Sequence, residues 1–237
     1  MIHPGKKIIG ITAAFQLRAV LGRIALIFLG IIFANLPAHA AGLSLEELIQ
    51  EMQTTYEKTS DLKANFIQEV TIKSMNKTDR EEGTVYFKNP KRMLWDYEKP
   101  KIKKLVINAK KSWLYLPDDK IVYIQESAGV FKSRIVVRFL SGIGSLKTDF
   151  SIKFSQPASD EQGNYLLTLT PKSPGLGVGK LFMTVDRDSY QIIQCRFSDA
   201  YGNATRIQFR GIQLNSGLPD KMFNFQPPPL VETVKMP

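Results

Sequence analysis

Between residues 44 and 61, apolar side chains recur at every third or fourth position. Ser44 is followed three positions later by Glu47, which is the pattern of a capping box at the start of a helix. The apolar positions that follow fall on one face of a helix: Leu45, Leu48, Ile49, Met52 and Tyr56. The sequence therefore predicts one amphipathic helix that ends near Thr59–Asp61.

After this helix the apolar period changes to two. Short alternating runs follow between 64 and 125, and again between 149 and 229, where the last run is 223–229. Asn-Pro, Lys-Pro and Pro-Asp-Asp turn signals separate the earlier runs, and residues 74–82 form a polar connection. This pattern predicts about ten or eleven strands. We expect a mostly β fold, either a barrel or a strongly curved antiparallel sheet with helices against it.

A second helical pattern interrupts the strands between residues 130 and 146. Its apolar positions recur at i, i+1, i+4, i+5 and i+8: Ile135, Val136, Phe139, Leu140 and Ile143. Arg134 and Arg138 fall off that face, and Gly142 and Gly144 end the pattern. We expect a short helix here.

The first 40 residues have the pattern of a secretory signal peptide. Their charges are all basic, an 11-residue apolar run covers 24–34, and Ala38-His39-Ala40 is an A-x-A cleavage site. The alternative is an uncleaved membrane anchor, but the apolar run falls short of the ~20 residues that span a bilayer core. We expect cleavage after Ala40, export from the cytoplasm, and one domain over 41–237.

The net charge of the mature domain limits which partners are expected. Without the four basic residues of the first 40, 28 basic and 22 acidic residues leave a net charge of +6. This charge suits an anionic membrane surface or an acidic partner, or serves solubility alone, and export makes nucleic acid the least expected partner.

Cys195 is the single cysteine, so no intramolecular disulfide forms, and both histidines, His3 and His39, lie in the segment to be removed. Histidine-dependent catalysis and histidine metal sites are thereby excluded from the mature domain.

Motifs for catalysis or cofactor binding are missing. The glycine-rich run 175–180 has Pro174 where a phosphate loop requires its first glycine, and Leu181 replaces the Ser/Thr that would hold magnesium. The neighbouring carboxylates at 118–119 and at 186 and 188 stand in turn contexts, where aspartate binds nearby backbone N–H groups. We therefore predict no enzyme, no metal and no cofactor.

The remaining candidate is apolar surface on the inner side of the curved sheet. The expected inner set combines aliphatic and aromatic side chains: Phe66, Val85, Phe87, Met93, Trp95, Tyr97, Leu105, Ile107, Trp113 and Tyr115. Such residues either fill a core or line a cavity, and composition does not separate the two.

Several stretches give the chain a resemblance to a known family. The runs 64–70, 83–100 and 105–117, together with Asp199–Phe209, Asn215 and 223–227, resemble the periplasmic outer-membrane lipoprotein carriers, LolA, over almost the whole mature chain. The resemblance implies an unclosed β-barrel with a lid of short helices over a hydrophobic cavity. It further implies a monomeric chaperone in the periplasm of a Gram-negative bacterium, which takes the acyl chains of lipoproteins from an inner-membrane ABC transporter to an outer-membrane acceptor. A related lipid-binding sensor or carrier with another ligand is the alternative.

The resemblance also assigns residues. It implies that the inner set binds lipid, that Trp95 and Leu105 match a family tryptophan and a pocket leucine, and that 135–140 belong to the lid. The family has an arginine, as a lid latch, where this chain has Asn89. The lysines expected to dock an acidic partner or lipid headgroups, or to be merely solvated, are Lys101, Lys103, Lys104, Lys110 and Lys111.

Overall fold

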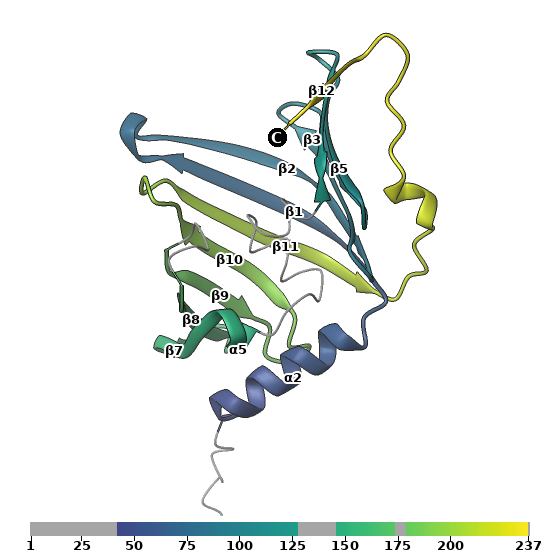
Figure 1. The fold of residues 1–237 in the computed structure, drawn as a ribbon. Coiled ribbons are helices and arrows are strands. Elements are labelled where there is room, and N and C mark those ends of the chain that lie inside the picture. Colours follow the sequence, from purple (N-terminus) through teal and green to yellow (C-terminus); the bar gives the residue numbers. More distant parts are fainter. Residues whose placement is uncertain (1–41, 128–145, 174–178, 237) are drawn as a thin grey trace, which may run out of the picture. The chain divides into compact units, whose positions relative to one another are not determined.

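The computed structural model describes residues 42–127, 146–173 and 179–236 (Figure 1). Residues Leu43–Pro237 form one compact unit. The predicted signal peptide (1–40) and the predicted lid residues (135–140) lie outside the described residues. Cleavage after Ala40 and the lid therefore remain predictions.

Helix α2 (Leu45–Glu57) begins at the predicted capping box. The Ser44 hydroxyl accepts the Glu47 N–H at 3.3 Å, and the Glu47 carboxylate accepts the Ser44 N–H at 2.8 Å. Each of these bonds satisfies an N–H group that the first helical turn leaves without a backbone acceptor. One face of the helix is buried, which confirms the predicted amphipathic helix: Leu48, Ile49, Met52 and Tyr56.

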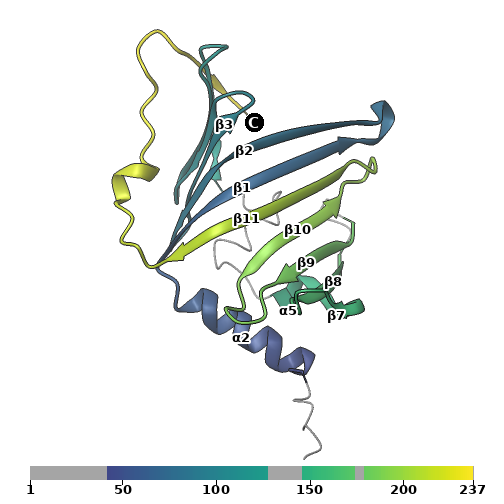
Figure 2. The ribbon, with the colours of Figure 1, turned by 180° about the vertical axis from the view of Figure 1, so that it is seen from behind.

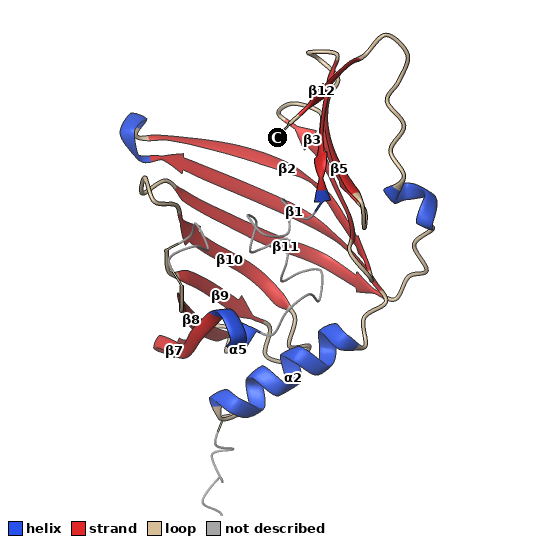
Figure 3. Cartoon of the chain, viewed as in Figure 1, coloured by secondary structure: helices blue, strands red, loops and turns tan. Residues whose placement is uncertain are grey.

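Twelve strands form one sheet in the described residues, and short helical turns are few (Figure 3). The strands are β1 Asp61–Ile72, β2 Lys77–Lys88, β3 Arg92–Lys99, β4 Lys103–Ile107, β5 Lys111–Leu116, β6 Ile121–Glu126, β7 Phe150–Ser159, β8 Tyr165–Pro171, β9 Leu181–Val185, β10 Ile192–Ser198, β11 Ala204–Leu214 and β12 Glu232–Lys235. The short helical elements are η2 Lys73–Met75, α5 Leu146–Asp149 and η4 Asp220–Phe223.

The order across the sheet is β12-β6-β5-β4-β3-β2-β1-β11-β10-β9-β8-β7. Neighbours are antiparallel, except that β12 runs parallel to β6. The two ends of this order, β12 and β7, do not pair, so the sheet is unclosed (Figure 2). The predicted mostly β, unclosed architecture is confirmed, with one or two more strands than expected.

Two boundaries were wrong. The polar connection expected at 74–82 is mostly strand: β1 and β2 continue to a tight turn at η2, because a two-stranded ladder is held by backbone bonds and tolerates exposed polar side chains. The strand expected at 223–229 is absent. Three consecutive prolines there lack the N–H groups that a ladder needs, and the chain pairs again only in β12.

The two sides of the sheet carry separate apolar clusters. We call the side with Phe66 and Trp95 the inner face, where one buried cluster combines residues of β1–β4, β7–β11 and α2. We call the side with Leu94 and Val106 the outer face. There a smaller cluster is completed by Leu218 and Phe223, which belong to residues 215–235, the C-terminal segment. In Figure 1 this segment is the yellow chain that leaves β11 and returns to the sheet as β12.

Candidate functional site

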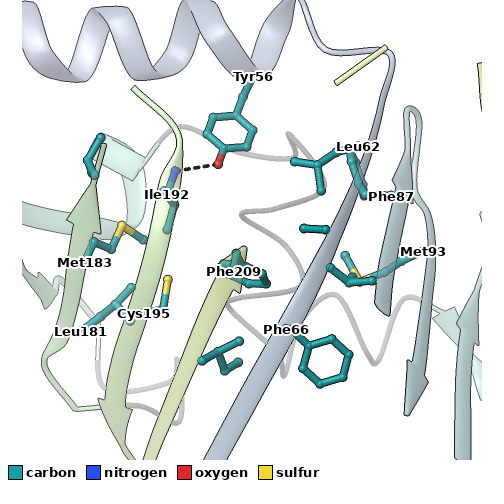
Figure 4. Close-up of a cluster of buried hydrophobic side chains, with 14 of the residues drawn as sticks. Tyr56, Leu62, Phe66, Phe87, Met93, Leu181, Met183, Ile192, Cys195 and Phe209 are labelled. Atoms are coloured by element: carbon teal, nitrogen blue, oxygen red, sulfur yellow. Dashed lines mark hydrogen bonds between the residues drawn. The ribbon is translucent and has the colours of Figure 1, made fainter. Parts of the chain in front are cut away.

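The inner face has an aromatic centre. The Phe66 ring meets those of Trp95 and Tyr97 edge-on, with centroids 4.7 and 5.0 Å apart, and Phe209 lies 6.3 Å from Trp95. Phe66 and Trp95 expose only 2% and 3% of their surface. Edge-to-face pairs of this kind add about 0.5–1.5 kcal/mol each beyond the burial of area. Figure 4 shows Phe66 and Phe209 on neighbouring strands.

Strand register explains how this centre forms. Val85 pairs with Trp95, and Trp95 pairs with Leu105, so these side chains stand in one row across β2, β3 and β4. The row beside it contains Phe87, Met93 and Ile107. The prediction that the β1–β4 residues of the inner set share one face is thus confirmed: Phe66, Val85, Phe87, Met93, Trp95, Tyr97, Leu105 and Ile107.

Trp113 and Tyr115 do not belong to this face, and the prediction that they do was wrong. Strand β5 pairs with β4 so that Leu114 lies opposite Leu105 and Trp113 lies opposite Val106. Trp113 and Tyr115 therefore point to the outer face. There the Phe225 ring lies 6.4 Å from Trp113 and 5.4 Å from Tyr115. Sequence alternation cannot choose the face, because aromatic and aliphatic positions of β5 are both apolar.

Helix α2 contributes the other part of the inner cluster. The Tyr56 hydroxyl accepts the Ile192 N–H at 3.1 Å, at the start of β10 (Figure 4). Burial raises the pKa of Tyr56, and burial raises the pKa of the nearby Cys195 thiol to about 12. Both groups are neutral at physiological pH, so this buried cluster is uncharged and apolar.

A polar row borders the aromatic centre at one end. The Tyr97 hydroxyl and the amide of Gln68 lie 3.4 Å apart, and the Gln68 amide donates to Glu81 at 3.3 Å. Lys103 donates to Glu81 at 2.6 Å and holds its ammonium group 4.3 Å from the centroid of the Tyr97 ring. We call Gln68, Glu81 and Lys103 the polar row. The side chains of the inner face thus change from apolar to polar or charged between neighbouring positions along the strands.

The five lysines expected at a docking surface separate into two groups. Lys103 pairs with Glu81, and Lys104 pairs with Asp96 at 3.0 Å, so both are engaged within the sheet. The other three are exposed: Lys101, Lys110 and Lys111.

Asn89, at the family's latch position, connects the β2–β3 turn to the end of α2. Its amide donates to the Thr59 carbonyl at 2.6 Å, and its backbone N–H donates to the Ser60 carbonyl at 2.9 Å. Arg92 instead lies 3.4 Å from Asp220, which is part of the C-terminal segment. Asn89 therefore holds the segment that connects α2 to β1, and its relation to a lid stays a prediction.

Asp61, at the end of the α2–β1 connection, binds the C-terminal segment. The sequence did not predict this role. The Asp61 carboxylate accepts hydrogen bonds from the N–H and hydroxyl of Ser216 and from the N–H groups of Gly217 and Leu218, at 2.7–3.3 Å. Burial by itself raises the pKa of Asp61, but the bonds from Ser216, Gly217 and Leu218 outweigh it and hold the pKa below 3.8. The only signal in the sequence is an aspartate directly after a helix, which is too common to be informative.

The Asp186 carboxylate forms the hydrogen bonds of a turn residue. Asp186 accepts hydrogen bonds from the hydroxyl and N–H of Ser189 and the N–H of Asp188, and the Ser189 bonds lower its pKa. Within the described ranges, no cluster of three His, Cys, Asp or Glu side chains is suited to a metal ion. The same part of the chain contains no helix long and apolar enough to cross a membrane.

Comparison with known proteins identifies a matching family and related sequences. The family model described as Outer membrane lipoprotein carrier protein LolA matches residues 57–226. An outer-membrane lipoprotein carrier protein of Methylobacillus flagellatus is 28% identical over 193 residues, which cover 76% of this chain and 85% of that protein. The corresponding protein of Dechloromonas aromatica is 27% identical over 198 residues, covering 83% and 89%.

One solved structure shares the fold. An uncharacterized conserved protein from Thermus thermophilus superposes with a TM-score of 0.53 at 12% identity, covering 82% of this chain and all of that one. Similarity at this level of identity supports the architecture and says nothing about a ligand.

Proposed function

The chain belongs to the LolA family of outer membrane lipoprotein carriers, and on that premise we propose that it carries the acyl chains of lipoproteins across the periplasm. The resemblance found in the sequence is confirmed by the family match. In the proposed cycle the protein, as a monomer, collects lipoprotein from an inner-membrane ABC transporter and delivers it to an outer-membrane acceptor. The observation that supports this function most is the extended apolar inner face.

The free-energy cost of exposing acyl chains to water is large. Exposing an acyl methylene to water costs ~0.8 kcal/mol, so a chain of about fifteen methylenes carries a penalty near ~12 kcal/mol. Acyl chains packed against Phe66, Met93, Trp95 and Leu105 would avoid this penalty without a covalent bond. Release requires only an acceptor that is more apolar still. No step of the cycle needs a catalytic group.

We assign the lipid contacts to the inner set without Trp113 and Tyr115. These two side chains contact Phe225 on the outer face, which suits a role in holding the C-terminal segment. The lid remains proposed for 135–140, by family resemblance. Asn89 holds the α2–β1 connection through its hydrogen bond to the Thr59 carbonyl.

The test is lipoprotein release from inner-membrane vesicles that contain the transporter, with ATP. The wild-type protein should release lipoprotein in a soluble complex, whereas Leu105→Glu should release little, because it places a charge beside Trp95. Gln162→Glu adds the same single negative charge at an exposed turn and should behave as wild type. A folded Leu105→Glu protein that carries as much cargo as wild type refutes the assigned face.

Mass spectrometry of ligands extracted from protein isolated from the periplasm provides a readout that does not depend on variants. Triacylated or diacylated lipoprotein supports the proposed carrier. A different lipid, found consistently and without lipoprotein, would instead identify the related lipid-binding function that the fold also permits.

A further inference from the structure

Strand β2 extends beyond β3 at one end. Residues Lys77–Glu82 pair with β1, but pairing with β3 starts only where Glu82 meets Lys99. Along Lys77–Glu81 no described strand pairs with the other side of β2. Alternate residues of this stretch therefore direct their N–H and C=O groups to a free side. We call Lys77–Glu81 the open edge; Figure 1 shows the β1–β2 hairpin that contains it.

A groove of about 390 Å³ lies along this open edge. Its other walls are two turns: Pro100–Lys103, between β3 and β4, and Leu116–Asp119, between β5 and β6. This volume falls within the range of ~300–1,000 Å³ that is usual for ligand sites. The groove thus combines a free strand edge with a defined opposite wall.

The groove has an unbalanced charge. Four of its ionic groups are paired: Asp79 with Lys77, Arg80 with Glu82, and Glu81 with Lys103. Asp118 and Asp119 are exposed and form no ion pair with another described residue, and the exposed Lys101 balances one of them. The remaining charge is negative and attracts a basic segment.

Apolar contact is available in the same place. Ile102 is 56% exposed at the tip of the β3–β4 turn, and Leu116 lines the opposite wall. An extended peptide directs alternate side chains to the same side, so one apolar residue between two basic residues fits this wall.

The groove begins where the inner face ends. Glu81 and Lys103 line the groove and also belong to the polar row, in which Lys103 lies over the Tyr97 ring. A polypeptide joined to acyl chains on the inner face passes Tyr97 and the polar row before it reaches the open edge. Because the two surfaces are continuous, one cargo molecule can occupy the groove and the inner face at the same time.

We propose that this groove binds the polypeptide segment next to the acyl chains of the cargo lipoprotein, as an extended, basic strand added to the open edge of β2. The inference rests on the proposed carrier function and adds a second point of recognition to it. Acyl chains on the inner face supply affinity, and the groove distinguishes cargoes by the charge of the adjoining polypeptide.

The test compares two synthetic peptides that carry two palmitoyl chains on an N-terminal cysteine. One peptide continues with an isoleucine between two lysines, and the other has serines in place of the lysines. Affinities are measured with full-length mature protein at low salt. The wild type should bind the lysine peptide about threefold to tenfold more tightly, and the preference should decrease as salt screens the charges. The double variant Asp118→Asn/Asp119→Asn should bind both peptides equally.

The matched control is Glu161→Gln/Asp188→Asn, which removes two exposed carboxylates outside the groove and should keep the preference. A photoreactive group on the peptide isoleucine should crosslink to Ile102 or Leu116. Equal binding of both peptides by the wild type, a preference that survives in the groove variant, or a crosslink elsewhere overturns the groove assignment. Failure of the serine peptide to bind at all contradicts the proposed carrier function instead, so the two failures are distinguishable.

Discussion

Replacement of Asp61 by alanine should loosen the connection between helix α2 and the C-terminal segment. Asp61 is 2% exposed, and its carboxylate accepts four hydrogen bonds from Ser216, Gly217 and Leu218. Hydrogen bonds to a charged group contribute about 1.5–3 kcal/mol each when taken singly. Ser216 and Gly217 are exposed, so water can replace the carboxylate there, whereas Leu218 is buried and its N–H loses its acceptor.

We therefore expect Asp61→Ala to lower the free energy of unfolding by about 3 kcal/mol, less than the sum of the four bonds because two of the three residues rehydrate. For a unit of this size, that loss lowers Tm by roughly 6–12 °C. Urea denaturation followed by circular dichroism measures the first value, and calorimetry measures the second. Asp119→Ala, in an exposed turn, is the control and should change stability by no more than about 0.5 kcal/mol.

The pH dependence provides an independent check. Because the folded pKa of Asp61 lies below its ordinary value of 3.8, its stabilisation is complete above that value and is lost as the pH falls through the lowered pKa. The difference in stability between wild type and Asp61→Asn should therefore be constant at neutral pH and shrink below about pH 4. A difference under about 0.5 kcal/mol at pH 7, or one that grows on acidification, would refute the reasoning.

Three further predictions concern packing. Gly83→Ala should destabilise the fold by about 1–3 kcal/mol in urea denaturation, because its new Cβ would lie 2.0 Å from the Asp96 carbonyl oxygen; wild-type stability would contradict this contact. Cys195 should resist thiol reagents at pH 8 until the protein is unfolded, since burial raises its pKa to about 12, and rapid labelling of the native protein would show that it is accessible. Phe225→Ala should shift tryptophan emission to longer wavelength by exposing Trp113, with a Trp113→Phe background as the control that removes the shift.

Most of the fold followed from the sequence. The change of period from 3.6 to two located helix α2 and most strands, because the first spacing places apolar residues on one side of a helix and the second places them on one side of a strand. The errors occurred where backbone pairing mattered more than side chains. The β1–β2 hairpin continues through a polar stretch, and the final apolar run is too rich in proline to pair.

The sequence by itself determined the capping box of α2, the alternation along β1–β4, the family, and the absence of histidine from residues 40–237. The tertiary structure alone decided which face each strand turns inward, since a shift of one residue in register moves every side chain to the other side. That is why Trp95 lies on the inner face and Trp113 on the outer one. It alone also decided contacts between distant segments, such as Asp61 with Ser216, because local patterns contain no information about partners 155 residues away.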